Sequence, residues 1–301
     1  MFSVLKKTGT FVLLIICGYI LKKLGIIKKK HLNVLEKIIM NFTLPCVFLS
    51  SSIGLSMNIM LIVYMMIGLF ANILLIGLSY FFTRKEEPII RGTFMIACSG
   101  YDVGNFVLPY VQAFFAASSV MYLLSFNIMN TMMSMGITFA MAYAITYKEV
   151  HFDVGAFFKR LFSSVSFDVY ILILLLACFN LSLPDVIVNV TSAIGSINPI
   201  LVMIMFGVKL ELHMSKSEYN HLFSIIGIRF LGALILCLIT VLLPINATAK
   251  LIFCMTYFGP LVSISSIYTK RLGYQGDVVA DANSLSIILS MLMMTLILII
   301  F

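Results

Sequence analysis

An aspartate lies between two glycines, shortly before a proline, inside a long apolar run. The run reads GTFMIACSGYDVGNFVLPYVQAFFA, with Asp102 between Gly100 and Gly104 and with Pro109 following. Glycine lowers helical preference and proline removes a backbone donor, so we expect a helix break between about residues 101 and 109. A carboxyl group at that depth favours its protonated form, which suits proton coupling; alternatively it caps broken backbone or pairs with a cation.

A second interruption of the same kind occurs late in the chain. The segment FCMTYFGPLVSISSIY puts Gly259 directly before Pro260. Broken backbone at bilayer depth needs hydrogen-bond partners, and two broken helices that cross can supply them. The second half-helices, beginning near Pro109 and Pro260, would direct the positive ends of their dipoles at the crossing, where an anion is favoured. The alternative is a pair of proline kinks with no functional role.

Two more charged residues fall within apolar runs. Arg229, in SIIGIRFLGALIL, could neutralise Asp102 or an anionic ligand, or its side chain could extend to the nearer membrane surface. Asp281 follows Asp277, which could cap the helix that begins there. Asp281 is therefore either part of the site or a solvated acid near a helix start.

Asparagines occupy comparable places in two further runs, at Asn130 and at Asn283 with Ser284. Buried amides need hydrogen-bond partners, so these residues either join neighbouring helices or contribute to the site together with Asn105. The predicted binding residues are Asp102, Gly104, Asn105, Pro109, Asn130, Gly259, Pro260, Asn283 and Ser284, with Asp102, Arg229 and Asp281 as coupling or charge-pairing residues.

The composition shows which elements must position these residues. Of 301 residues, 61% are hydrophobic and only 11% are charged, with a mean hydropathy of +1.11. A soluble domain carries about 25% charged residues, so this chain lacks the polar surface of a soluble protein. Its apolar residues form continuous runs, which favour helices over a barrel. We expect ten spans, at about 8–27, 31–50, 57–82, 89–115, 118–147, 167–183, 187–208, 219–243, 247–269 and 277–301.

Basic residues predict the orientation of these spans. Fifteen of the twenty lie in connections that follow odd-numbered spans, and three lie on the other side. The positive-inside rule then makes the fifteen cytoplasmic and leaves both termini extracytoplasmic. The fifteen are Lys22, Lys23, Lys28, Lys29, Lys30, Arg84, Lys85, Arg91, Lys148, Lys159, Arg160, Lys209, Lys216, Lys270 and Arg271.

The spacing of landmarks predicts an internal repeat. A polar linker at 148–166 separates five spans at 1–147 from five at 167–301, so the second half would enter the membrane inverted. Three pairs of residues recur at offsets of 154, 151 and 153: Pro45 with Pro199, Pro109 with Pro260, and Asn130 with Asn283.

Several classes of protein are disfavoured. The sequence has neither a phosphate-binding G-x-x-x-x-G-K-[ST] loop nor an H-E-x-x-H helix, so we expect no enzyme, no metal and no cofactor. The net charge of +8 is dispersed over short clusters between apolar runs, which argues against nucleic acid as a partner. The six cysteines all lie in apolar segments and are interpreted as small buried hydrophobic residues.

Five segments resemble the auxin efflux carrier family, whose bacterial members include carriers of organic acids. They are MNFTLPCVFLSS at 40–51, GYDVGNFVLPYVQAFFA at 100–116, INPILVMIMFGVKL at 197–210, GIRFLGALI at 227–235, and FGPLVSISSIYTKRLGYQGDVVADANSLSIILSM at 258–291. The resemblance implies an all-α membrane protein with ten transmembrane helices in two inverted five-helix repeats, in which helices 4 and 9 are broken and cross. It also implies a scaffold of helices 1, 2, 6 and 7 that often dimerises, and a transport bundle of helices 3–5 and 8–10. Asp102 departs from the pattern, because many members have Asn there.

These features together predict a secondary transporter that moves a small organic anion across the cell membrane by alternating access. A proton or sodium is the expected coupling ion, and membrane lipid is the surrounding partner. A membrane sensor that binds its ligand without transport, or a channel, is the alternative.

Overall fold

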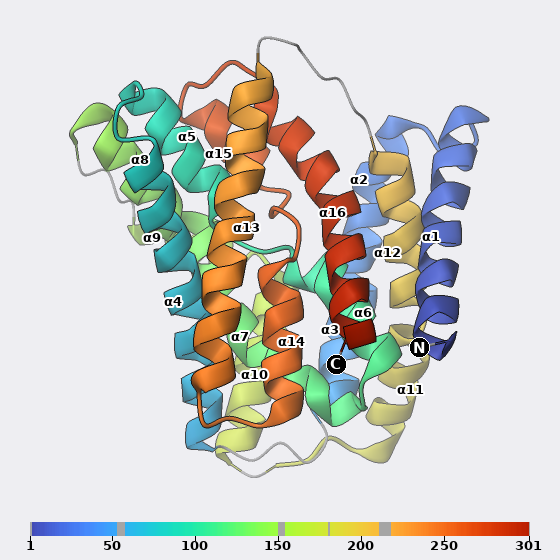
Figure 1. Ribbon diagram of the computed structural model, residues 1–301. Coiled ribbons are helices and arrows are strands. Elements are labelled where there is room, and N and C mark those ends of the chain that lie inside the picture. Colours follow the sequence, from blue (N-terminus) through green and yellow to red (C-terminus); the bar gives the residue numbers. More distant parts are fainter. Residues whose placement is uncertain (1, 53–57, 150–153, 180, 211–217, 301) are drawn as a thin grey trace.

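The computed structural model describes residues 2–52, 58–149, 154–179, 181–210 and 218–300, and within these ranges the chain forms helices and no strands (Figure 1). Lys216 and residues 150–153 of the predicted linker lie outside them. The α-helices are α1 (Phe2–Lys23), α2 (Lys29–Ile38), α3 (Leu44–Ser51), α4 (Ile59–Phe82), α5 (Pro88–Cys98), α6 (Leu108–Phe114), α7 (Val120–Met132), α8 (Thr138–Tyr147), α9 (Val154–Leu161), α10 (Val165–Cys178), α11 (Asp185–Gly195), α12 (Asn198–Lys209), α13 (Tyr219–Leu242), α14 (Ala247–Tyr257), α15 (Ser265–Arg271) and α16 (Val278–Ile300).

Seven helical runs among the described residues are long and apolar enough to cross a membrane, which makes the protein a polytopic helical membrane protein. Three of these runs are each built from successive helices that follow one another end to end. The seven are Val4–Lys23, Lys30–Ser51, Ile59–Phe82, Ala117–Tyr147, Asp185–Lys209, Tyr219–Leu242 and Val278–Ile300.

Shorter helices occupy the other three predicted ranges. The range 167–183 holds α10, which has 14 residues. The ranges 89–115 and 247–269 each hold two short helices separated by irregular backbone, α5 with α6 and α14 with α15.

Three of the predicted spans contain one turn of π-helix each: η1 (Ile39–Thr43), η2 (Val103–Val107) and η4 (Met133–Ile137). A π-turn inserts an extra residue into the hydrogen-bond ladder and is frequent at functional sites. Each of the three contributes a residue to the cavities described below.

Close backbone contact joins elements that are far apart in sequence. Helix α1 packs along α12 on one side of the molecule, and α4 packs along α7 (Figure 1). Gly207 of α12 permits the first contact, because a Cβ there would overlap the carbonyl oxygen of Ile15. Without water to drive association, helices in membranes rely on small residues of this kind for close packing.

Candidate functional site

The first break lies slightly earlier than the sequence predicted. Helix α5 ends at Cys98, and irregular backbone continues to Asp102 before η2 begins. Gly100 has a φ of 79°, a left-handed conformation that glycine adopts without strain. Pro109 lies outside the break, at the start of α6, where a missing backbone donor costs little.

The second break is longer and contains both predicted residues. Helix α14 ends at Tyr257 and α15 begins at Ser265, with Gly259 and Pro260 in the irregular segment between them. The second half-helix therefore starts five residues after the proline, and the prediction that it begins near Pro260 was only approximate. The two breaks meet directly, because the Asp102 amide donates to the Pro260 carbonyl at 3.1 Å.

Arg229 of α13 binds both breaks. Its Nη1 donates to the carbonyl oxygens of Cys98 at 2.6 Å and Gly100 at 2.9 Å, and its Nη2 donates to that of Gly259 at 2.8 Å. The side chain is 4% exposed and its guanidinium lies over the Tyr101 ring at 5.1 Å, so it does not extend to a membrane surface. These three hydrogen bonds of Arg229 go to carbonyl oxygens, which satisfies acceptors that the broken helices leave open.

Two buried amides complete the first break. Asn130 of α7 accepts from the Tyr101 amide at 3.0 Å and donates to the Tyr101 carbonyl at 2.9 Å, so one side chain pairs with both backbone groups of Tyr101. Asn72 of α4 accepts from the Gly100 amide at 2.8 Å. Asn130 thus provides hydrogen-bond partners for backbone groups at the crossing. Asn72 does the same, although the sequence did not predict it as a site residue.

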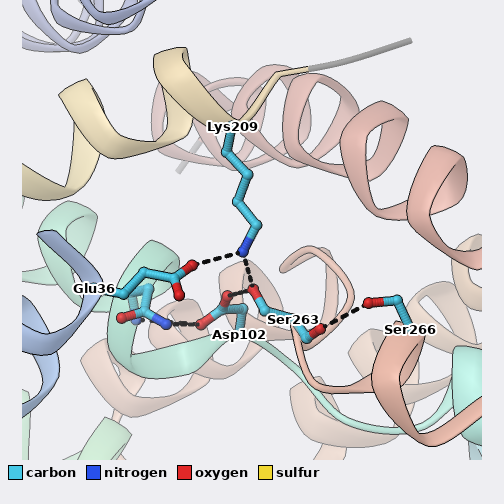
Figure 2. Close-up of polar contacts among 6 residues, drawn as sticks. Glu36, Asp102, Lys209, Ser263 and Ser266 are labelled. Carbon is cyan, nitrogen blue, oxygen red and sulfur yellow. Dashed lines mark hydrogen bonds and ion pairs between the residues drawn. The ribbon is translucent and has the colours of Figure 1, made fainter. Parts of the chain in front are cut away.

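Asp102 belongs to a chain of polar contacts (Figure 2). Its Oδ1 accepts from the Asn105 amide at 3.3 Å and from Asn105 Nδ2 at 2.9 Å, so it caps η2. Its Oδ2 accepts from Ser263 Oγ at 3.2 Å, and Ser263 Oγ accepts from Lys209 Nζ at 2.9 Å. Lys209 also donates to Glu36 Oε1 at 3.2 Å. The predicted pairing of Asp102 with a cation is therefore indirect, through a serine, and the cation is Lys209.

A cavity of about 680 Å³ leads to this chain of contacts. It is lined by Asp277, whose side chain is 67% exposed, and by Lys209, Ser263 and Asn105. A narrower hollow of about 80 Å³ shares Asn105 with it and extends to Asp102, Gly104 and Asn130. Met40, Asn105 and Met135, one residue from each π-turn, line the cavity. The π-turns thus shape the route from the surface to the crossing.

Helix α16 forms another wall of the cavity. Asp281, Asn283 and Ser284 all line it, and Asp281 is 5% exposed, so it is not a solvated acid. Ser286, one turn further along α16, accepts from the Leu261 amide at 3.2 Å and so binds the second break.

Aromatic side chains pack together in the segment that follows the first break. Phe106 and Tyr110 are fully buried, and their ring centroids lie 5.9 Å apart. Phe106 also contacts Phe206 of α12 at 5.2 Å, and Tyr110 contacts Phe11 of α1 at 5.1 Å. This aromatic cluster joins η2 and α6 to α1 and α12.

The structure brings most predicted site residues together around the crossing, but with different tasks. Asp102, Gly104, Asn105, Asn130, Asn283 and Ser284 line the cavity or its narrow extension, as does Asp281, whereas Pro109, Gly259, Pro260 and Arg229 line neither. Lys209, Glu36 and Ser263 were missed. Lys209 ends an otherwise apolar run, INPILVMIMFGVK, and that position was the one available signal.

No protein-family model matches this chain, and no curated protein matches its sequence. The functional argument therefore rests on the geometry of the crossing and its cavity.

Proposed function

We propose that the protein is a secondary transporter that moves a small organic anion, such as a mono- or dicarboxylate, across the cytoplasmic membrane by alternating access. One observation carries the proposal: a single cavity is lined both by the exposed Asp277 and by Asn105 and Ser263, which lie at the crossing of two broken helices. Alternating access requires a binding site beside broken helices that solvent reaches from one side of the membrane at a time.

The proposal includes ten membrane crossings. Seven come from the long apolar runs, one from α10, and one from each broken pair, α5 with α6 and α14 with α15. We further propose that the halves 1–147 and 167–301, joined by the linker 148–166, are inverted repeats.

Contacts between corresponding segments of the two halves support the repeat. The two breaks meet at Asp102 and Pro260, and Thr43 Oγ1 donates to Asn198 Oδ1 at 2.8 Å beside the prolines of the first pair. Membership of the auxin efflux carrier family is part of the same proposal, with helices 1, 2, 6 and 7 as a scaffold that can form a homodimer.

The predicted orientation makes the cavity face the cytoplasm. Lys209 ends α12, Lys28 precedes α2 and Lys270 ends α15, so basic residues flank the end at which the cavity opens. Both chain termini would then be extracytoplasmic.

Polar groups at the inner end of the cavity would hold the anion. Lys209 Nζ is a donor there, and Asn283 also lines the cavity. Asn105 Oδ1 is buried and has no donor among the described residues, so it can accept from a ligand hydroxyl or a protonated carboxyl group. Asp102 would be the coupling residue.

Uptake into proteoliposomes tests the proposal. Purified protein should catalyse saturable counterflow of at least one labelled mono- or dicarboxylate, with and without sodium present. Asp102→Asn should change the pH dependence of that uptake, because an amide cannot release the proton. If D102N and the unaltered protein show the same pH profile, Asp102 has no proton role.

A sensor on the same fold is the second candidate. Protein that binds a carboxylate in a thermal-shift screen but never moves it across a sealed vesicle would favour the sensor and overturn the transporter.

A further inference from the structure

Two carboxylates surround the ammonium group of Lys209. Its Nζ lies 3.2 Å from Glu36 Oε1 and 2.9 Å from Ser263 Oγ, and the same serine donates to Asp102 Oδ2 at 3.2 Å. Figure 2 shows Lys209 extending to both Glu36 and Ser263, with Asp102 beyond the serine. Lys209 and Glu36 lie on α12 and α2, which pack together, whereas Ser263 and Asp102 come from the two breaks.

Of these acids, Glu36 is the one that a ligand can replace. Lys209 and Glu36 both line the cavity, and their side chains are 26% and 36% exposed. An ion pair that remains in contact with water contributes little to stability, so its exchange for another carboxylate costs little. Asp102 is 4% exposed and is held by Asn105 as well as by Ser263.

The charges around Lys209 decide what must accompany an anion. Asp277 is paired with Lys270 at 2.6 Å, and Asp281 adds a further acid to the cavity wall. Lys209 is the one cation among the described residues that line this cavity. Lys37 and Arg271 line a second cavity, of about 510 Å³, which shares Glu36 with the first. An anion that joined ionised Glu36 and Asp102 would meet an excess of negative charge, and a proton on Glu36 would remove that excess while releasing Lys209.

We propose that Lys209 binds the carboxylate of the ligand and that Glu36 is its internal counter-ion, which leaves Lys209 on taking up a proton. The class of ligand rests on the proposed function, but the exchange at Lys209 can be tested separately from transport. Anion binding and proton uptake are then linked at the ion pair, not only at Asp102.

Binding to the purified full-length chain in detergent tests the exchange. The probes are sodium acetate, succinate and benzoate, with sodium chloride as the ionic-strength control, and calorimetry measures Kd at several pH values. For the probe that binds best, Glu36→Gln should bind about tenfold more tightly than the unaltered protein at neutral pH, which corresponds to about 1.4 kcal/mol. The affinity of E36Q should also lose most of its pH dependence, while Lys209→Gln should lose binding and Lys209→Arg should retain it.

Matched surface variants control for charge alone. Glu86→Gln and Lys85→Gln make the same changes in the exposed connection before α5, and both should bind the probe as the unaltered protein does. Thermal unfolding of each variant checks that it is folded.

Three results would overturn the proposal: E36Q binds no probe more tightly, its binding keeps the original pH dependence, or folded K209Q and K209R bind equally well. Counterflow in vesicles separates this proposal from the transport proposal. If binding follows the expected pattern but no counterflow occurs, the transport proposal is wrong and the Lys209 site is supported. If counterflow occurs and neither E36Q nor K209Q changes it, the transport proposal is supported and the Lys209 site is wrong.

Discussion

The two breaks are held in different ways. Three helices bind the first break from outside: Asn72 of α4, Asn130 of α7 and Arg229 of α13. All of its residues from Ser99 to Asp102 are buried. The second break closes partly on itself, with the Gly259 amide bonded to the Thr256 carbonyl, and its residues 262–264 are partly exposed and line the cavity.

This difference separates a fixed element from an adaptable one. Backbone that is bonded to side chains of three other helices cannot move without breaking several buried hydrogen bonds at once. Backbone whose hydrogen bonds are made within its own short turns, and which faces a cavity, can rearrange at a lower free-energy cost. We therefore expect the second break, with Ser263, to change when a ligand binds, while the first break stays in place.

The largest loss of stability should follow substitution of Arg229, because this side chain is hydrogen-bonded to both breaks. Arg229→Met would leave the carbonyls of Cys98, Gly100 and Gly259 without their donor, at a cost of about 3–5 kcal/mol in unfolding free energy. Circular dichroism during titration into sodium dodecyl sulfate measures this loss; the chain has no tryptophan to follow. Arg84→Met, at an exposed position, is the matched control. A loss below about 1 kcal/mol would contradict the role of Arg229 at the crossing.

Asn130→Leu should weaken the first break alone. The Tyr101 amide and carbonyl would lose their partner, and we expect a destabilisation of about 1–3 kcal/mol. Cys98 is fully buried at the edge of this break, so its labelling by a maleimide reports opening. In a variant that keeps Cys98 as its sole cysteine, N130L should label at least about fivefold faster. Asn189→Leu, at an exposed position on α11, should leave the rate unchanged.

Ser286→Ala should have the smallest effect, because it removes one hydrogen bond from the second break. Side-chain hydrogen bonds in membrane proteins contribute about 0.6 kcal/mol on average, and the Leu261 amide loses only this partner. The same detergent titration measures the loss. If S286A costs as much as N130L, the two breaks are held equally and the proposed difference between them is wrong.

The sequence predicted the helices and the existence of both breaks, because hydropathy and the Gly and Pro positions are local signals. It placed the first break too late, since Pro109 is tolerated at the start of α6 while Gly100 supplies the left-handed turn. The polar partners were less predictable. Asn72 stands in an uninterrupted apolar helix, and Lys209 looked like one of many basic residues beside a loop. Only the tertiary packing brings each of them to the crossing.

The contacts of Arg229 also affect the order in which parts of the protein can fold during synthesis. A chain is made from its N-terminus, so Cys98 and Gly100 are inserted long before Arg229, which follows them by 131 and 129 residues. Until α13 arrives, their carbonyl oxygens lack this donor, and the first half cannot reach its final packing alone. A ribosome-bound chain that ends before α13 should therefore be recognised by membrane proteases as unfinished, and the complete chain should not.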